Sequence, residues 1–167
     1  MSDDMEVYLV NLGRYNSDGS TGDWFRLPID YEDVKERLRI AEDYEEISIL
    51  DTQGFPCSVS EYSSIEELNS LYNAIQELPD YLVDALDELI DEFGSIEGVC
   101  ENQDRVIYHS ECADMADVAR YYVLELGILG EIPPFFTEFI NYEDYGATLL
   151  SSGTYIETSH GMYEITY

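Results

Sequence analysis

The feature that most constrains this chain is a long acidic block that contains no base. Residues 40–104 hold 18 Asp and Glu side chains and no Lys or Arg. Residues 1–39 carry a net charge of −4 and residues 105–167 a net charge of −8, so the block supplies most of the formal net charge of −30. Such a chain will not bind DNA, RNA or an anionic membrane through charge. Its natural partners are cations or a strongly basic protein surface.

Within this block, residues 78–94 have the spacing of one amphipathic helix with an acidic polar face. Leu82, Leu86, Leu89, Ile90 and Phe93 form the apolar stripe. Six acid pairs lie three or four residues apart, and their repulsion sums to about 1–3 kcal/mol. Six carboxylates between residues 80 and 92 span about 18 Å, or about one charge per 3 Å. One strand of duplex DNA carries a charge every 3.4 Å or so, so we interpret this face as a copy of a polyanion.

The alternative interpretation is an ordinary solvated surface, such as a halophilic protein displays. A halophilic composition would spread its acids evenly along the chain. Here the acids are concentrated in one block of 65 residues that contains no base. The distribution therefore favours a specific basic partner.

The order of the expected elements predicts an α+β fold with three small subdomains. Strands at 5–12, 24–28 and 45–51, a loop at 16–23 and a helix over 30–40 indicate an N-terminal α+β subdomain, residues 1–61. A capping box at Ser64 and Glu67, the helix over 78–94 and a third helix from Ser95 indicate an acidic helical subdomain, residues 62–103. The C-terminal α+β subdomain, residues 104–167, is expected to hold a strand at 105–109, a helix over 114–126, two further helices and a closing hairpin.

Other chemistry is mostly excluded. The single lysine, Lys35, does not follow a glycine, which excludes a Walker phosphate loop. The loop from Asn16 lacks the Gly and Glu that an EF-hand requires. Cys100, His109 and Cys112, with Cys57 or His160, match no compact zinc module. No nucleophile motif is present, so we expect neither an enzyme, nor a metal, nor a cofactor.

The sequence also indicates where the protein resides. It contains no apolar run of about 18 residues, and its N-terminus is acidic, so we expect neither a membrane span nor a secretory signal. Three cysteines without an export signal predict reduced thiols. A cytoplasmic protein is expected.

Four stretches resemble the antirestriction ArdA family and cover essentially all of the chain. They are the first 30 residues, FPCSVSEYSSIEELNSLYNAIQEL at 55–78, YHSECADMADVARYYVLELGILGEIP at 108–133, and SSGTYIETSHGMYEITY at 151–167. The resemblance implies a non-enzymatic inhibitor of type I restriction-modification enzymes, carried on mobile genetic elements such as conjugative plasmids and transposons. It also implies an elongated three-part protein that forms homodimers and mimics bent duplex DNA. The family's antirestriction motif maps to residues 126–140, a region tied to self-association and activity.

Charge and resemblance together predict a DNA mimic that occupies the DNA-binding groove of a type I enzyme, formed by its methyltransferase core with the specificity subunit. The alternative is an acidic regulator or chaperone of a basic DNA-binding protein. The carboxylates that we predict to stand in for phosphates are Glu42, Asp43, Glu45, Glu46, Glu66, Glu67, Glu77, Asp80, Asp84, Asp87, Glu88, Asp91, Glu92, Glu97 and Glu101. The predicted motif and dimer region comprises Leu126, Gly127, Ile128, Leu129, Gly130, Glu131, Ile132, Phe135, Phe136 and Phe139.

Overall fold

The structure, a computed structural model, describes residues 4–19, 22–41 and 46–167. It mixes helices and strands, which confirms the α+β class. The chain divides into two compact units, Met1–Cys100 and Glu101–Tyr167, and each is described by itself below. The expected three-part division at residues 61 and 103 stays a prediction.

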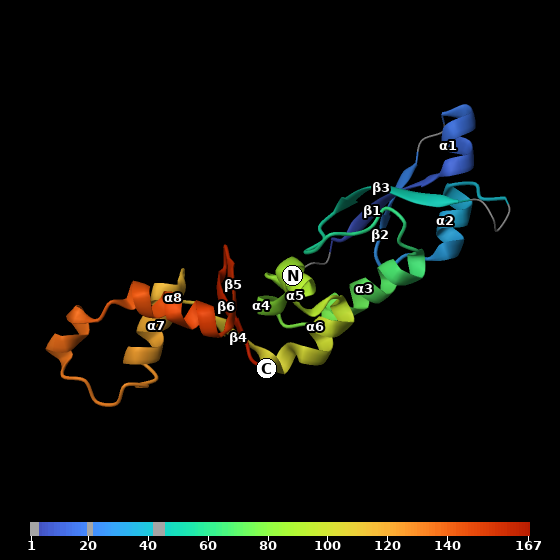
Figure 1. Ribbon diagram of the computed structural model, residues 1–167. Coiled ribbons are helices and arrows are strands. Elements are labelled where there is room, and N and C mark those ends of the chain that lie inside the picture. The colour runs from blue at the N-terminus through green and yellow to red at the C-terminus, as the bar shows by residue number, and fades with distance from the viewer. Residues whose placement is uncertain (1–3, 20–21, 42–45) are drawn as a thin grey trace. The chain divides into compact units, whose positions relative to one another are not determined.

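The first unit is built on an antiparallel sheet of three strands, ordered β2-β1-β3 (Figure 1). The strands are β1 (Glu6–Asn11), β2 (Asp23–Arg26) and β3 (Ile47–Gln53). Val7 pairs with Phe25 on one side and Thr52 on the other. Val7, Leu9, Val10 and Phe25 are buried, so the predicted strand β1 belongs to the core of this unit.

Two short helices accompany this sheet. The helix α2 (Tyr31–Arg37) begins as predicted, because the Asp30 carboxylate accepts a hydrogen bond from the Glu32 N–H at 3.0 Å. The helix α1 (Leu12–Asp18) was not expected, and the prediction of a loop from residue 16 was wrong for its first three residues. Asn11 caps α1 through the Arg14 N–H. Its sequence, LGRYNSD, holds several weak helix formers, so propensity alone gave no signal.

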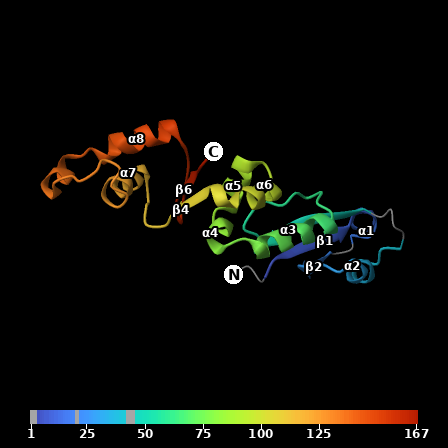
Figure 2. The same ribbon diagram turned by 90° about the horizontal axis from the view of Figure 1, so that it is seen from below.

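The helix α3 (Ile65–Glu77) covers one face of the sheet (Figure 1 and Figure 2). Both halves of the predicted capping box are present: the Glu67 N–H donates to Ser64 Oγ at 3.1 Å, and the Ser64 N–H donates to Glu67 Oε2 at 2.8 Å. The Asn69 amide exchanges two hydrogen bonds with the backbone of Ile29, at 2.7 and 2.9 Å. These bonds fix the acidic helix to the segment that follows β2.

The expected single helix over 78–94 is two helices, α4 (Asp80–Val83) and α5 (Leu86–Phe93), so that prediction was wrong. The chain leaves helical geometry at Ala85, with φ −123° and ψ 24°. Ala85 is fully buried, as are Leu82 and Leu89. Hydrophobic periodicity records only which side chains are apolar, and the apolar spacing continues through the break. The acid pairs 84/87 and 84/88 therefore span a turn and do not share one helix.

The end of this helical segment follows the prediction. Gly94 ends α5 with φ 86°, a conformation that favours glycine, and its N–H bonds the Ile90 carbonyl at 2.7 Å. Ser95 Oγ accepts a hydrogen bond from the Gly98 N–H at 3.1 Å and so starts α6 (Ile96–Asn102). The boundary between the two units falls inside α6.

The second unit contains a three-stranded antiparallel sheet ordered β4-β6-β5. Its strands are β4 (Val106–His109), β5 (Thr154–Thr158) and β6 (Gly161–Ile165), preceded by a short 3₁₀ helix, η1 (Gln103–Arg105). The predicted strand at 105–109 and the closing hairpin are confirmed. Tyr163 and Met162 of β6 are buried at the centre of the sheet.

Two helices and a 3₁₀ helix complete this unit. They are α7 (Met115–Leu124), η2 (Pro134–Phe139) and α8 (Tyr142–Ser152). Asp114 caps α7 through the Asp117 N–H at 2.9 Å, close to the predicted start. The helices α7 and α8 approach closely at Gly146, where a Cβ would lie 2.4 Å from the Met115 carbonyl oxygen. Only glycine permits this packing.

Candidate acidic binding surface

The predicted carboxylates that the structure describes are all exposed side chains. Glu42, Asp43 and Glu45 lie outside the described residues. Eleven of these predicted carboxylates lie in the first unit, and we call them the acidic surface. They are Glu46, Glu66, Glu67, Glu77, Asp80, Asp84, Asp87, Glu88, Asp91, Glu92 and Glu97. The twelfth, Glu101, lies in α6 at the start of the second unit.

Amphipathic helices present most of this surface. In α3 the buried side chains Leu68 and Ile75 hold the helix against the core, and the acids lie on the other side. In α5 the buried residues are Leu86 and Leu89, and the exposed residues are Asp87, Glu88, Asp91 and Glu92. The same periodicity that buries the leucines therefore displays the acids.

Two bases of the first unit, Arg37 and Arg26, pair with carboxylates of its own N-terminal segment. Arg37 contacts Asp23 at 2.7 Å and Asp33 at 3.1 Å, and the hydrogen bond to Asp23 is the main cause that raises the pKa of Arg37. Arg26 contacts Asp4 at 2.6 Å. The helices between residues 65 and 97 have no base of their own, so their surface is of one sign.

Two members of the acidic surface also stabilise the fold, which sequence reasoning recognised only for Glu67. The carboxylate of Asp87 accepts a hydrogen bond from the Ser58 N–H at 2.8 Å and lies 3.4 Å from the Ser58 hydroxyl. The two residues are 29 positions apart, so no local pattern could have shown this contact. Asp87 therefore fixes the 57–58 loop to α5.

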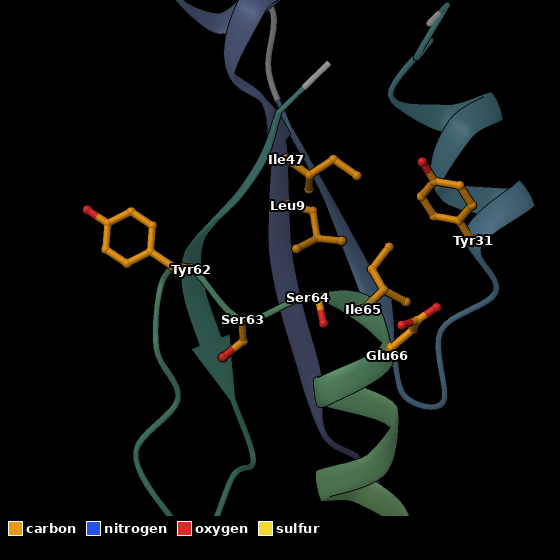
Figure 3. Close-up of a pocket in the computed structure, with 8 residues that line it drawn as sticks. All are labelled: Leu9, Tyr31, Ile47, Tyr62, Ser63, Ser64, Ile65 and Glu66. Carbon is orange, nitrogen blue, oxygen red and sulfur yellow. The ribbon is translucent and has the colours of Figure 1, made fainter. Parts of the chain in front are cut away.

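A pocket of about 450 Å³ opens beside the N-terminus of α3 (Figure 3). Leu9, Ile47 and Ile65 point into it and make it largely apolar. Tyr31 stands at one side, Glu66 lies at its edge, and the exposed ring of Tyr62 points away from it (Figure 3). No sequence pattern indicated this pocket, because its residues come from β1, α2, β3, the loop at 62–64 and the start of α3.

Cys57, Cys112 and His109 are buried. Burial raises the pKa of the Cys57 thiol to about 11, with a further contribution from the Asp87 charge. Burial likewise raises the pKa of Cys112. His109 Nε2 lies 3.1 Å from Glu164 Oε2, and the Tyr122 hydroxyl donates to the same carboxylate. Among the described residues, no group of three or more His, Cys, Asp or Glu side chains could hold a metal ion.

The second unit displays an exposed apolar region between α7 and the end of η2. We call Leu126, Ile128, Leu129, Phe135, Phe136 and Phe139 the apolar surface. All six are exposed, from 47% for Ile128 to 78% for Phe139. The rings of Phe135 and Phe136 contact each other with centroids 4.3 Å apart. Of the other predicted motif residues, Ile132 is half-buried, and Gly127, Gly130 and Glu131 are exposed.

Residues 7–164 match the protein family described as Antirestriction protein (ArdA). The chain belongs to the ArdA family. The match spans both units, so it includes the acidic surface as well as the apolar surface. Membership in ArdA makes this chain an antirestriction protein, of a family of inhibitors that act against restriction-modification enzymes. A comparison with curated proteins gave no match.

Over residues 4–19, 22–41 and 46–167, no helix is both long enough and apolar enough to cross a membrane.

Proposed function

We propose that this ArdA protein is a DNA mimic that occupies the DNA-binding groove of a type I restriction-modification enzyme and thereby blocks restriction. The observation that carries the proposal is the acidic surface: eleven exposed carboxylates in a part of the chain without bases. A groove that binds DNA is lined with Lys and Arg side chains that contact the phosphates. Carboxylates fixed on helices offer these bases the same charge.

The charge density of α5 supports this comparison. Four carboxylates lie on its eight residues, which is about 12 Å of helix. The spacing is again about one charge per 3 Å, near the roughly 3.4 Å of one DNA strand. The break at Ala85 means that the charges of α4 and α5 do not follow one straight axis. The mimicry that we propose therefore rests on several short helices, each with its own direction.

We also propose that the protein acts as a homodimer formed through the apolar surface. Isolated exposed apolar residues are ordinary, but six large ones within 14 residues of chain are characteristic of an interaction site. The acidic surface cannot face its own copy, because burying like charges without partners is costly. A two-fold dimer would double the length of charged surface available to a target with two similar recognition halves.

The proposal is tested by binding to a purified type I methyltransferase core with its specificity subunit, with and without duplex DNA of unrelated sequence. We expect DNA to displace the protein competitively, and we expect the affinity to fall steeply as salt rises. Affinity that is insensitive to salt, or binding that DNA leaves unchanged, would contradict mimicry. Equal binding to isolated histone-like proteins would instead indicate an acidic chaperone.

A further inference from the structure

The pocket beside α3 differs chemically from the acidic surface around it. Its floor is formed by Leu9, Ile47 and Ile65, and Tyr31 supplies an aromatic side (Figure 3). A volume of about 450 Å³ is within the range of roughly 300–1,000 Å³ that is usual for ligand sites. Carboxylates that imitate DNA phosphates need no apolar pocket beside them, so the proposed mimicry does not explain why this pocket is there.

The charged residue among the described lining residues is acidic: Glu66 lies at the edge of the pocket (Figure 3). The base Lys35 contacts one lining residue, because its Nζ lies 4.8 Å from the centroid of the Tyr31 ring. Lys35 also lies 3.8 Å from Glu32, which offsets its charge. An occupant with an apolar body and positive neighbours would fit both the floor and the rim.

We propose that this pocket receives one large apolar side chain of a basic protein partner, an aromatic or long aliphatic residue flanked in its sequence by Arg or Lys. The inference rests on the proposed function, because it assigns part of the partner's recognition to a contact other than charge. It gives the pocket the role of an anchor site and gives Glu66 the role of selecting a basic flank.

DNA-binding proteins supply a physical reason for such a side chain. Proteins that bend DNA insert apolar wedges between base steps while their bases contact the neighbouring phosphates. A slot with an apolar floor and the Glu66 carboxylate at its edge offers the same two contacts side by side. The pocket would then correspond to an opened base step, and Glu66 to a phosphate beside it.

The test uses the full-length protein and a set of synthetic pentapeptides. The first carries Trp between two pairs of Arg, the second replaces the Trp by Ala, and the third flanks the Trp with Glu. We expect the first peptide to bind about tenfold or more tightly than the second, as burial of one aromatic side chain would give. It should also shift the methyl signals of Ile47 and Ile65 in an NMR titration. The acidic peptide should bind far more weakly than the first.

Two variants link the preference to the pocket. Ser63→Trp fills the space from a half-buried lining position, and we expect it to abolish the difference between the Trp and Ala peptides. Ser70→Trp, at an exposed position of α3 outside the lining, is the matched control and should keep the difference. Tyr31→Ala removes the aromatic side of the pocket at a residue that is 40% exposed, so it should weaken the preference even if Ser63→Trp does not fold. Tyr15→Ala is its control.

The outcomes separate this inference from the proposed function. Equal binding of the Trp and Ala peptides, or an acidic Trp peptide that binds as well as the basic one, would overturn the anchor site. Either result leaves mimicry intact as long as DNA still displaces the protein from a methyltransferase core. A clear preference for the basic Trp peptide that both pocket variants lose supports the anchor site, whatever the restriction enzyme does.

Discussion

Asp87 accepts two contacts from Ser58 and is also one of the carboxylates expected to stand in for phosphates. It lies in the first turn of α5, where a negative charge is favourable. We expect Asp87→Ala to lower the free energy of unfolding by about 1 kcal/mol, discounted for the exposure of the carboxylate. The melting temperature should fall by about 2–4 °C. Thermal unfolding followed by circular dichroism measures the change.

Asp91→Ala is the matched control for Asp87→Ala. Asp91 is exposed on the same helix and has Glu88 and Asp87 as acidic neighbours three and four residues away. Its removal should leave the melting temperature unchanged or raise it slightly, because two like-charge pairs disappear. If the two variants melt alike, the bond to Ser58 contributes nothing and Asp87 is an ordinary surface acid.

Cys57 gives a prediction for alkaline pH. Its pKa is raised from 9.0 to about 11 in the folded protein. As pH rises between these values, the unfolded chain loses the thiol proton first, so the free energy of unfolding falls, by up to about 1.4 kcal/mol per pH unit. Across this pH window, the melting temperature of Cys57→Ala should fall less with rising pH than that of the wild type. Equal slopes would show that the thiol is not the titrating group.

At the scale of elements, the helix ends that depend on one capping residue were predictable from sequence. Asp30, Ser64, Gly94 and Asp114 mark helix ends through contacts with residues at most four positions away, and such contacts are visible in sequence. The break at Ala85 was not predictable in this way, because the apolar spacing continues through it. The helix α1 does have a local cap at Asn11, but its sequence holds several weak helix formers, so the cap alone did not mark a helix.

The candidate surface likewise has features that were predictable from sequence and features that were not. Amphipathic spacing predicted which carboxylates would be exposed, because a helix that buries its leucines must turn its acids outward. The contact between Asp87 and Ser58 and the pocket beside α3 join residues far apart in the chain. Local periodicity carries no information about such contacts, so only the fold reveals them.

The helices α4 and α5 lead to the central prediction about inhibition. Replacing Asp80, Asp84, Glu88 and Asp91 by Asn or Gln removes four exposed carboxylates but keeps Asp87 and its structural bond. We expect the fold to be retained, inhibition of a type I enzyme to weaken by tenfold or more, and the salt dependence of binding to become shallower. Inhibition assays over a range of ionic strength measure both effects.

The control neutralises four exposed acids of the second unit, Glu111, Glu125, Glu143 and Glu157. It changes the net charge by the same amount. If long-range attraction alone mattered, both variants would lose the same inhibition. If only the α4 and α5 variant loses inhibition, these carboxylates contact the enzyme. If both variants inhibit fully, the acidic surface is an ordinary solvated surface.

At the scale of the whole molecule, a net charge of −30 opposes folding through self-repulsion. Salt shortens the Debye length from about 10 Å at 0.1 M to about 3 Å at 1 M. We therefore expect the melting temperature to rise with NaCl concentration, and to rise less in the variant with Asp80, Asp84, Glu88 and Asp91 neutralised. A melting temperature that is flat or falls across this range would mean that repulsion does not limit stability.

The apolar surface gives the last prediction, which concerns assembly. Leu129 and Phe139 are 59% and 78% exposed in a single chain, so replacing both by Asp removes no core packing but puts charge into the proposed interface. We expect wild-type protein to sediment as a dimer at micromolar concentration and the double variant to sediment as a folded monomer, because two copies would bury like charges together.

The matched control for this double variant is Leu50→Asp with Ile107→Asp, which adds the same charge at two exposed apolar positions outside the apolar surface. It should remain dimeric. If the dimer extends the charged surface offered to the enzyme, the Leu129 and Phe139 variant should also inhibit less well than the control. A wild-type monomer, or a dimer that survives both aspartates, would place the contact between copies elsewhere and would leave the exposed phenylalanines of η2 for another partner.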